Sequence, residues 1–74
     1  MSKLPVVSGR DAVRVFGKLG YLLDRQNGSH MILRNEASPF RRLTVPDHRT
    51  IAKGTLRSLI REAGLTVDEF VGLL

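Results

Sequence analysis

The chain has 74 residues, 42% of them hydrophobic, and its twelve lysines and arginines outnumber seven acids to give a net charge of +5. This length suits one small domain over residues 1–74, and the absence of cysteine excludes disulfides, a thiol nucleophile and a thiolate metal site. No apolar run approaches the roughly 20 residues of a membrane span. Residues 1–7 lack the long apolar region of a signal peptide, so we expect a cytoplasmic protein without membrane contact.

The first predicted element is a helix that starts after Ser8. Ser8 and Asp11 have the spacing of a capping box, and Gly20 has the position of a C′ residue that ends the helix. Apolar residues follow the cap at helical spacing: Ala12, Val13, Phe16 and Leu19. Cations recur every fourth residue on another face: Arg10, Arg14 and Lys18. The helix should therefore turn one stripe to a core and a basic stripe outward.

Three strands are predicted next, over residues 21–25, 30–34 and 41–45. Asn27-Gly28 between the first two is a strong hairpin signal, since both residues tolerate a positive φ. In the second strand, alternation places His30, Ile32 and Arg34 on one face and the residues between them on the other. Residues 35–39 are expected to form a loop, and Pro46 to stop the third strand.

Two more helices complete the chain after a connection over residues 46–53. One runs from Gly54 or Thr55 to Ala63 and stops at Gly64, and Thr66 and Glu69 form a second capping box for a short last helix. The order α-β-β-β-α-α predicts an α+β two-layer sandwich, with helices on one face of a three-stranded antiparallel sheet.

The excess of basic residues favours a polyanionic partner, most often nucleic acid, although an ordinary solvated surface can carry the same charge.

His30, beside the hairpin signal, has the side chain best suited to proton transfer near neutral pH. Residue type alone favours a half-exposed histidine that ends a turn, and the hairpin position raises the catalytic alternative. His48 fits a second acid, a phosphate or partner contact or, more simply, a turn. The spacing of histidines and acids matches no metal signature, so neither a metal nor another cofactor is expected.

Three segments then match a known family. They are Leu19–Leu33 with its Gly-Ser-His stretch, Leu43–His48 with Val-Pro-x-His, and Lys53–Leu65 with a Gly-Thr-Leu helix. Through them the chain resembles the HicA family of small toxins, which are mRNA interferases with a fold like that of double-stranded-RNA-binding domains (dsRBD-like).

The resemblance implies that His30 is catalytic and that the substrate is RNA. It also implies a HicB-type antitoxin that covers the active site, and contact with DNA only through the toxin–antitoxin complex. Gly28 is then the turn that lets His30 project. Further candidates for substrate binding are Gly28, Ser29, Arg10, Arg14, Lys18, Arg34 and Lys53. The second acid or base of the reaction could be His48, an arginine or water.

Two other functions stay open on the sequence. One is a non-catalytic RNA-binding module of the same fold, which needs the basic stripes but no histidine. The other is a protein-interaction subunit whose basic face docks an acidic partner. Cleavage of RNA would distinguish a nuclease from the non-catalytic RNA-binding module. RNA affinity with a steep salt dependence would count against the protein-interaction subunit.

Overall fold

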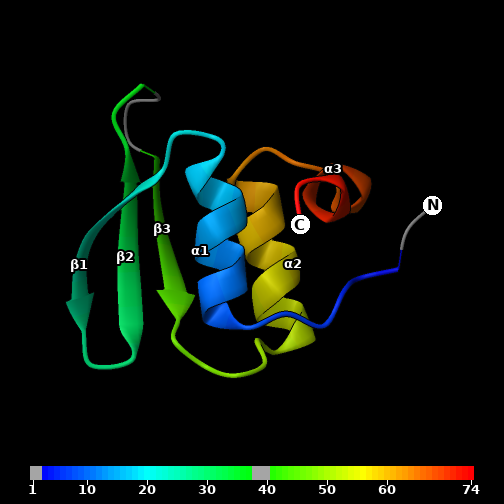
Figure 1. Cartoon of the computed structure of the whole chain (residues 1–74), viewed down its shortest axis with the longest axis horizontal. Coiled ribbons are helices and arrows are strands. Elements are labelled where there is room, and N and C mark those ends of the chain that lie inside the picture. The colour runs from blue at the N-terminus through cyan, green and yellow to red at the C-terminus, as the bar shows by residue number, and fades with distance from the viewer. Residues whose placement is uncertain (1–2, 38–40) are drawn as a thin grey trace.

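The computed structural model describes residues 3–37 and 41–74 (Figure 1). Its elements, in chain order, are α1 (Gly9–Gly17), β1 (Leu22–Asn27), β2 (His30–Asn35), β3 (Arg41–Pro46), α2 (Lys53–Glu62) and α3 (Val67–Gly72). The predicted order and the α+β class are confirmed. Residues 38 and 39 of the predicted loop, and Phe40, lie outside the described residues.

The sheet is antiparallel with β2 in the middle, in the order β1-β2-β3. The predicted alternation in β2 is confirmed, because Met31 and Leu33 are buried whereas His30 and Arg34 are exposed. The first strand spans residues 22–27 rather than 21–25. It holds a bulge at Asp24, so that Leu23 pairs with Leu33 but Arg25 pairs with Ile32.

Both capping boxes are present. The Ser8 hydroxyl accepts from the Asp11 backbone N–H at 3.0 Å, and the Asp11 carboxylate accepts from the Ser8 N–H at 3.2 Å. Thr66 and Glu69 repeat this arrangement at the start of α3. These reciprocal bonds satisfy backbone donors that the first helical turn leaves without partners.

Gly20 and Gly64 follow the two long helices as C′ residues, as predicted. Gly20 has a φ of +99° and Gly64 one of +79°, a region that glycine enters without a Cβ penalty. After α1, the N–H of Tyr21 donates to the carbonyl of Phe16, and the N–H of Gly20 donates to that of Gly17. The same pair of bonds follows α2, so both ends are Schellman motifs.

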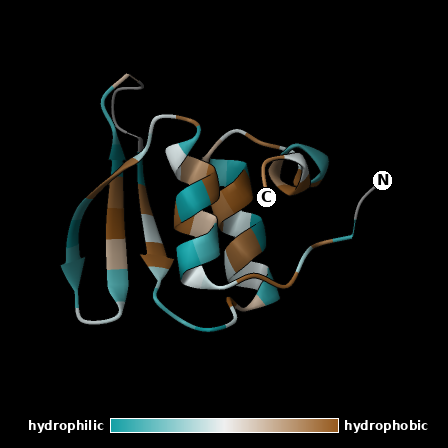
Figure 2. Cartoon of the chain, viewed as in Figure 1, coloured by the Kyte–Doolittle hydropathy of each residue, from teal (hydrophilic) through white to brown (hydrophobic). Residues whose placement is uncertain are grey.

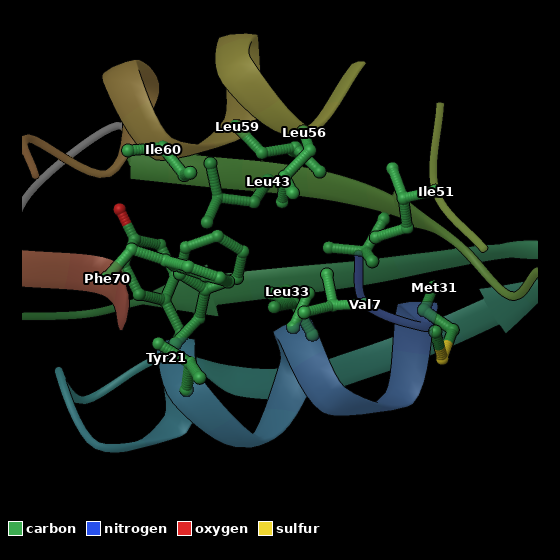
Figure 3. Packing of buried hydrophobic residues seen from close by; sticks show 14 residues of the cluster. Val7, Tyr21, Met31, Leu33, Leu43, Ile51, Leu56, Leu59, Ile60 and Phe70 are labelled. Carbon is green, nitrogen blue, oxygen red and sulfur yellow. The ribbon is translucent and has the colours of Figure 1, made fainter. Parts of the chain in front are cut away.

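The core lies between the helices and the inner face of the sheet. Phe16 of α1 is fully buried, with its ring centroid 5.6 Å from Phe70 and 6.1 Å from Tyr21. Figure 3 shows Phe70 and Tyr21 at one end of this core. Leu33 and Leu43 of the central and third strands lie under the helices in the same cluster. Apolar residues accordingly concentrate on β2, β3 and the helices (Figure 2). No helix in the described part of the chain is long and apolar enough to cross a membrane.

Strand β1 has little share in this core. All six of its residues are exposed, and Leu22 and Leu23 keep 68% and 52% of their surface accessible. The β1–β2 hairpin therefore extends beyond the helical layer, and side-chain packing contributes little to holding its tip.

Asn35 departs from the prediction, because it ends β2 instead of starting a loop. The residue is only 8% exposed. Its amide Nδ2 donates to the Leu19 carbonyl at 3.3 Å, and Oδ1 accepts from the Ala37 N–H at 3.1 Å. The residue thus ties the turn after α1 to the end of the sheet.

We expect Asn35→Ala to lower the free energy of unfolding by about 1–2 kcal/mol, because it removes two part-buried hydrogen bonds to the backbone groups of Leu19 and Ala37. Urea denaturation measures this loss. Thr44→Ala, on the exposed face of β3, is the control and should stay within about 0.5 kcal/mol of wild type. Equal stability of the two variants would contradict this role for Asn35.

Candidate active site

A two-residue loop carries His30. Asn27 pairs with His30 across the hairpin, which leaves Gly28 and Ser29 as the loop. The turn therefore lies one residue later than the predicted Asn27-Gly28. Gly28 has a φ of +61°, which both preferred types of two-residue hairpin turn require at this first loop position.

His30 is the first residue of the central strand. It lies between Asn27 of β1 and Pro46 of β3, and it is exposed on the sheet face turned away from the helices. Arg25 and Ile32, which pair with one another, belong to the same face. The imidazole is thus reachable by a large ligand while its backbone is held by strands on both sides.

A polar cluster lies behind this hairpin, centred on Asp47. The Asp47 carboxylate accepts from Nε2 of Gln26 at 3.0 Å and from Nε of Arg10 at 3.3 Å. The Asp47 backbone N–H donates to the Ser29 carbonyl at 2.6 Å. Nε2 of Gln26 also donates to the Gly28 carbonyl at 3.1 Å. Sequence reasoning missed Gln26 and Asp47 as residues of this site.

The starts of two helices lie at the same end of the molecule as the hairpin tip (Figure 1). Arg10 is in the first turn of α1, and Lys53 begins α2. The N terminus of α2 has neither a side-chain cap nor an acidic residue in its first turn among the described residues. Helix N-termini carry partial positive charge, so the start of α2 favours anions, whereas the start of α1 already has the Asp11 carboxylate.

The structure divides the predicted substrate contacts into two groups. Gly28, Ser29, Arg10 and Lys53 share the end of the molecule that carries His30. The other three cations contact groups elsewhere in the fold. Nη1 of Arg14 lies 3.8 Å from Oδ1 of Asp11, and Nη2 of Arg34 lies 3.5 Å from Oδ2 of Asp24. Nζ of Lys18 donates to the Leu73 carbonyl at 2.6 Å. Lys18 and Arg34 are at the end opposite to His30 (Figure 1).

His48 is exposed in the connection between β3 and α2. Its backbone carbonyl accepts from the N–H of Gly9 at 2.9 Å, which joins the connection to the start of α1. The described residues contain no group of three or more histidines or acids that could hold a metal ion.

Hydrogen bonds lower the pKa of two carboxylates near this end. The pKa of Asp47 is held below the ordinary 3.8 mainly by the hydrogen bond from Arg10, and next by the hydrogen bond from Gln26. The pKa of Asp11 is lowered mainly by the Ser8 backbone N–H and then by the Ser8 hydroxyl.

The lowered pKa of Asp47 predicts that the stability of the fold depends on pH. A folded-state pKa below the unfolded one means that the stabilisation is present above pH 3.8 and is lost as the pH falls through the folded-state value. We expect the urea midpoint of wild type to drop between about pH 5 and about pH 3, and to drop less in Asp47→Asn. An unchanged pH slope in that variant would contradict the assignment.

The geometry defines a class: small basic α+β domains with an exposed histidine at the tip of a hairpin. Within that class, the family model described as the HicA toxin of bacterial toxin–antitoxin systems matches residues 9–65, which include the hairpin, the connection and α2. The chain belongs to this family and is therefore a toxin of a toxin–antitoxin system, paired with an antitoxin. No curated protein matches the chain.

Proposed function

We propose that the chain is a metal-independent endoribonuclease, an mRNA interferase, in which His30 transfers the proton. The observation that carries this proposal is the position of His30, exposed at the start of the central strand within the segment that matches the toxin family. The family is generally one of ribonuclease toxins, which supports the choice of reaction.

The chemistry needs few groups from the protein. His30 takes the proton from a ribose 2′-hydroxyl, and that oxygen attacks the adjacent phosphorus. The bond to the 5′-oxygen breaks, the leaving oxygen takes up a proton, and a 2′,3′-cyclic phosphate remains. Arg25, an exposed cation on the same sheet face as His30, stabilises the negative charge that develops on the phosphate. The nucleophile belongs to the substrate, so no metal-activated water is needed.

A HicB-type antitoxin is the proposed partner. His30 lies on the sheet face that α1, α2 and α3 leave uncovered, and a protein docked there would exclude RNA from it. The toxin acts on mRNA in the cytoplasm, and it meets DNA only through the antitoxin in the complex. This arrangement gives inhibition by occlusion, without any change in the toxin itself.

The decisive experiment is cleavage of a labelled RNA by the purified chain in excess EDTA. We expect cleavage with cyclic phosphate ends, and arrest of growth when the chain is produced alone. Co-production of the neighbouring gene's product should restore growth. RNA binding without cleavage would instead support a non-catalytic RNA-binding module, and absence of RNA binding would support a subunit that only docks a protein.

A further inference from the structure

The tip of the β1–β2 hairpin needs a support other than packing. All residues of β1 and the loop are exposed, yet a proton-transfer group must hold its position to a fraction of an ångström for efficient reaction. Hydrogen bonds must therefore fix the two peptide units that directly precede His30.

Both of these peptide units are held by the polar cluster. The carbonyl of Ser29, whose carbon is bonded to the nitrogen of His30, accepts from the Asp47 N–H at 2.6 Å. The carbonyl of Gly28 accepts from Gln26, and the same Gln26 amide donates to the Asp47 carboxylate. The Asp47 backbone N–H therefore holds one peptide unit, through a bond that side-chain substitution keeps, and the Asp47 carboxylate acts on the other through Gln26.

The cluster is also attached to the rigid part of the fold. Arg10 of α1 approaches Asp47 with Nε at 3.3 Å and Nη2 at 3.5 Å, a two-pronged contact with both carboxylate oxygens. The next residue of the connection, His48, accepts from the N–H of Gly9. Three segments thus converge on one carboxylate: the first turn of α1, the end of β1 and the β3–α2 connection.

The bulge at Asp24 makes this convergence possible. Paired residues of an antiparallel sheet lie on the same face, and Gln26 pairs with Met31, which is buried on the helical side. Without the extra residue, the alternation would turn Gln26 to the face of His30, away from α1. The bulge therefore places the Gln26 amide where Asp47 and Arg10 lie.

We propose that Asp47 is a positioning residue for His30: it fixes the Gly28-Ser29 loop to α1 through Gln26 and Arg10, and so sets where the imidazole meets the RNA. This inference rests on the proposed ribonuclease function. Asp47 need not touch the substrate. Its removal should slow the chemical step more than it weakens binding, because exposed cations elsewhere still hold the RNA backbone.

The experiment compares Asp47→Ala and Asp47→Asn with wild type and with Glu36→Gln. Glu36 lies after the end of β2 far from His30, and its change alters the net charge as Asp47→Asn does. We expect kcat for RNA cleavage to fall at least about tenfold in Asp47→Ala, with KM changed less than about threefold. Asp47→Asn, which keeps an acceptor oxygen, should lie between Asp47→Ala and wild type, and Glu36→Gln should match wild type.

A second measurement does not depend on activity. Backbone 15N relaxation should show increased fast motion of Gly28, Ser29 and His30 in Asp47→Ala, and in Gln26→Ala, which serves if Asp47→Ala fails to fold. An unchanged loop, or an unchanged kcat in a variant with a loosened loop, overturns the positioning role. If wild type fails to cut RNA, the ribonuclease proposal fails by itself, and relaxation still decides whether Asp47 orders the segment that carries His30.

Discussion

Replacing His30 by alanine is expected to lower RNA cleavage by about a thousandfold, within the 10²–10⁴ that a positioned acid–base group contributes. The side chain is exposed at the first position of β2, so its removal creates no cavity and should change the free energy of unfolding by less than about 0.5 kcal/mol. Initial rates on a labelled RNA in EDTA measure the loss, and circular dichroism verifies the fold. Growth arrest should disappear with the activity.

His48→Ala is the matched control for that experiment. The contact recorded for His48 runs through its backbone carbonyl to Gly9, which alanine keeps. We therefore expect this variant to lose less than about tenfold in rate. A larger loss would identify His48 as the second group in proton transfer. A folded His30→Ala protein that cleaves RNA at the wild-type rate would remove His30 from the mechanism, whatever the result for His48.

Local signals made most of the fold predictable. A capping box needs two residues three apart, and a Schellman motif needs one glycine, so Ser8, Gly20, Gly64 and Thr66 were placed correctly. The alternation in β2 depends only on period two. Each of these features is decided within a few residues, and local sequence therefore specifies it.

The polar cluster behind His30 could not be predicted in the same way. Gln26 and Asp47 are 21 positions apart, and Arg10 and Asp47 are 37 apart. Their contact depends on a bulge at Asp24 and on a hairpin turn shifted by one residue, and neither has a sequence signal as clear as Asn-Gly. The pairing register of distant segments thus brings these three side chains together, and the local sequence pattern does not contain that register. The burial of Asn35 likewise depends on a distant partner, the Leu19 carbonyl.

Gly9→Ala is expected to be the most destabilising of the substitutions considered. The start of α1 touches the end of β3, and a Cβ at Gly9 would overlap the Pro46 carbonyl oxygen and lie 3.1 Å from the Cα of Asp47. These are backbone atoms, which cannot rotate away as a side chain can. Relief requires α1 to move from the sheet, so we expect a loss of about 2–3 kcal/mol in the free energy of unfolding.

Gly17→Ala is the matched control, since Gly17 ends the same helix and a Cβ there meets nothing within 4 Å. Alanine should be neutral or stabilise by up to about 1 kcal/mol, because it restricts the unfolded chain more than glycine does. Urea midpoints of the two variants measure the difference, and equal midpoints would contradict close packing at Gly9. The Cβ of Gly9→Ala would overlap the Pro46–Asp47 peptide, which leads into Asp47. A Gly9→Ala protein that still folds should therefore cleave RNA more slowly than wild type. Gly17→Ala should cleave RNA as wild type does.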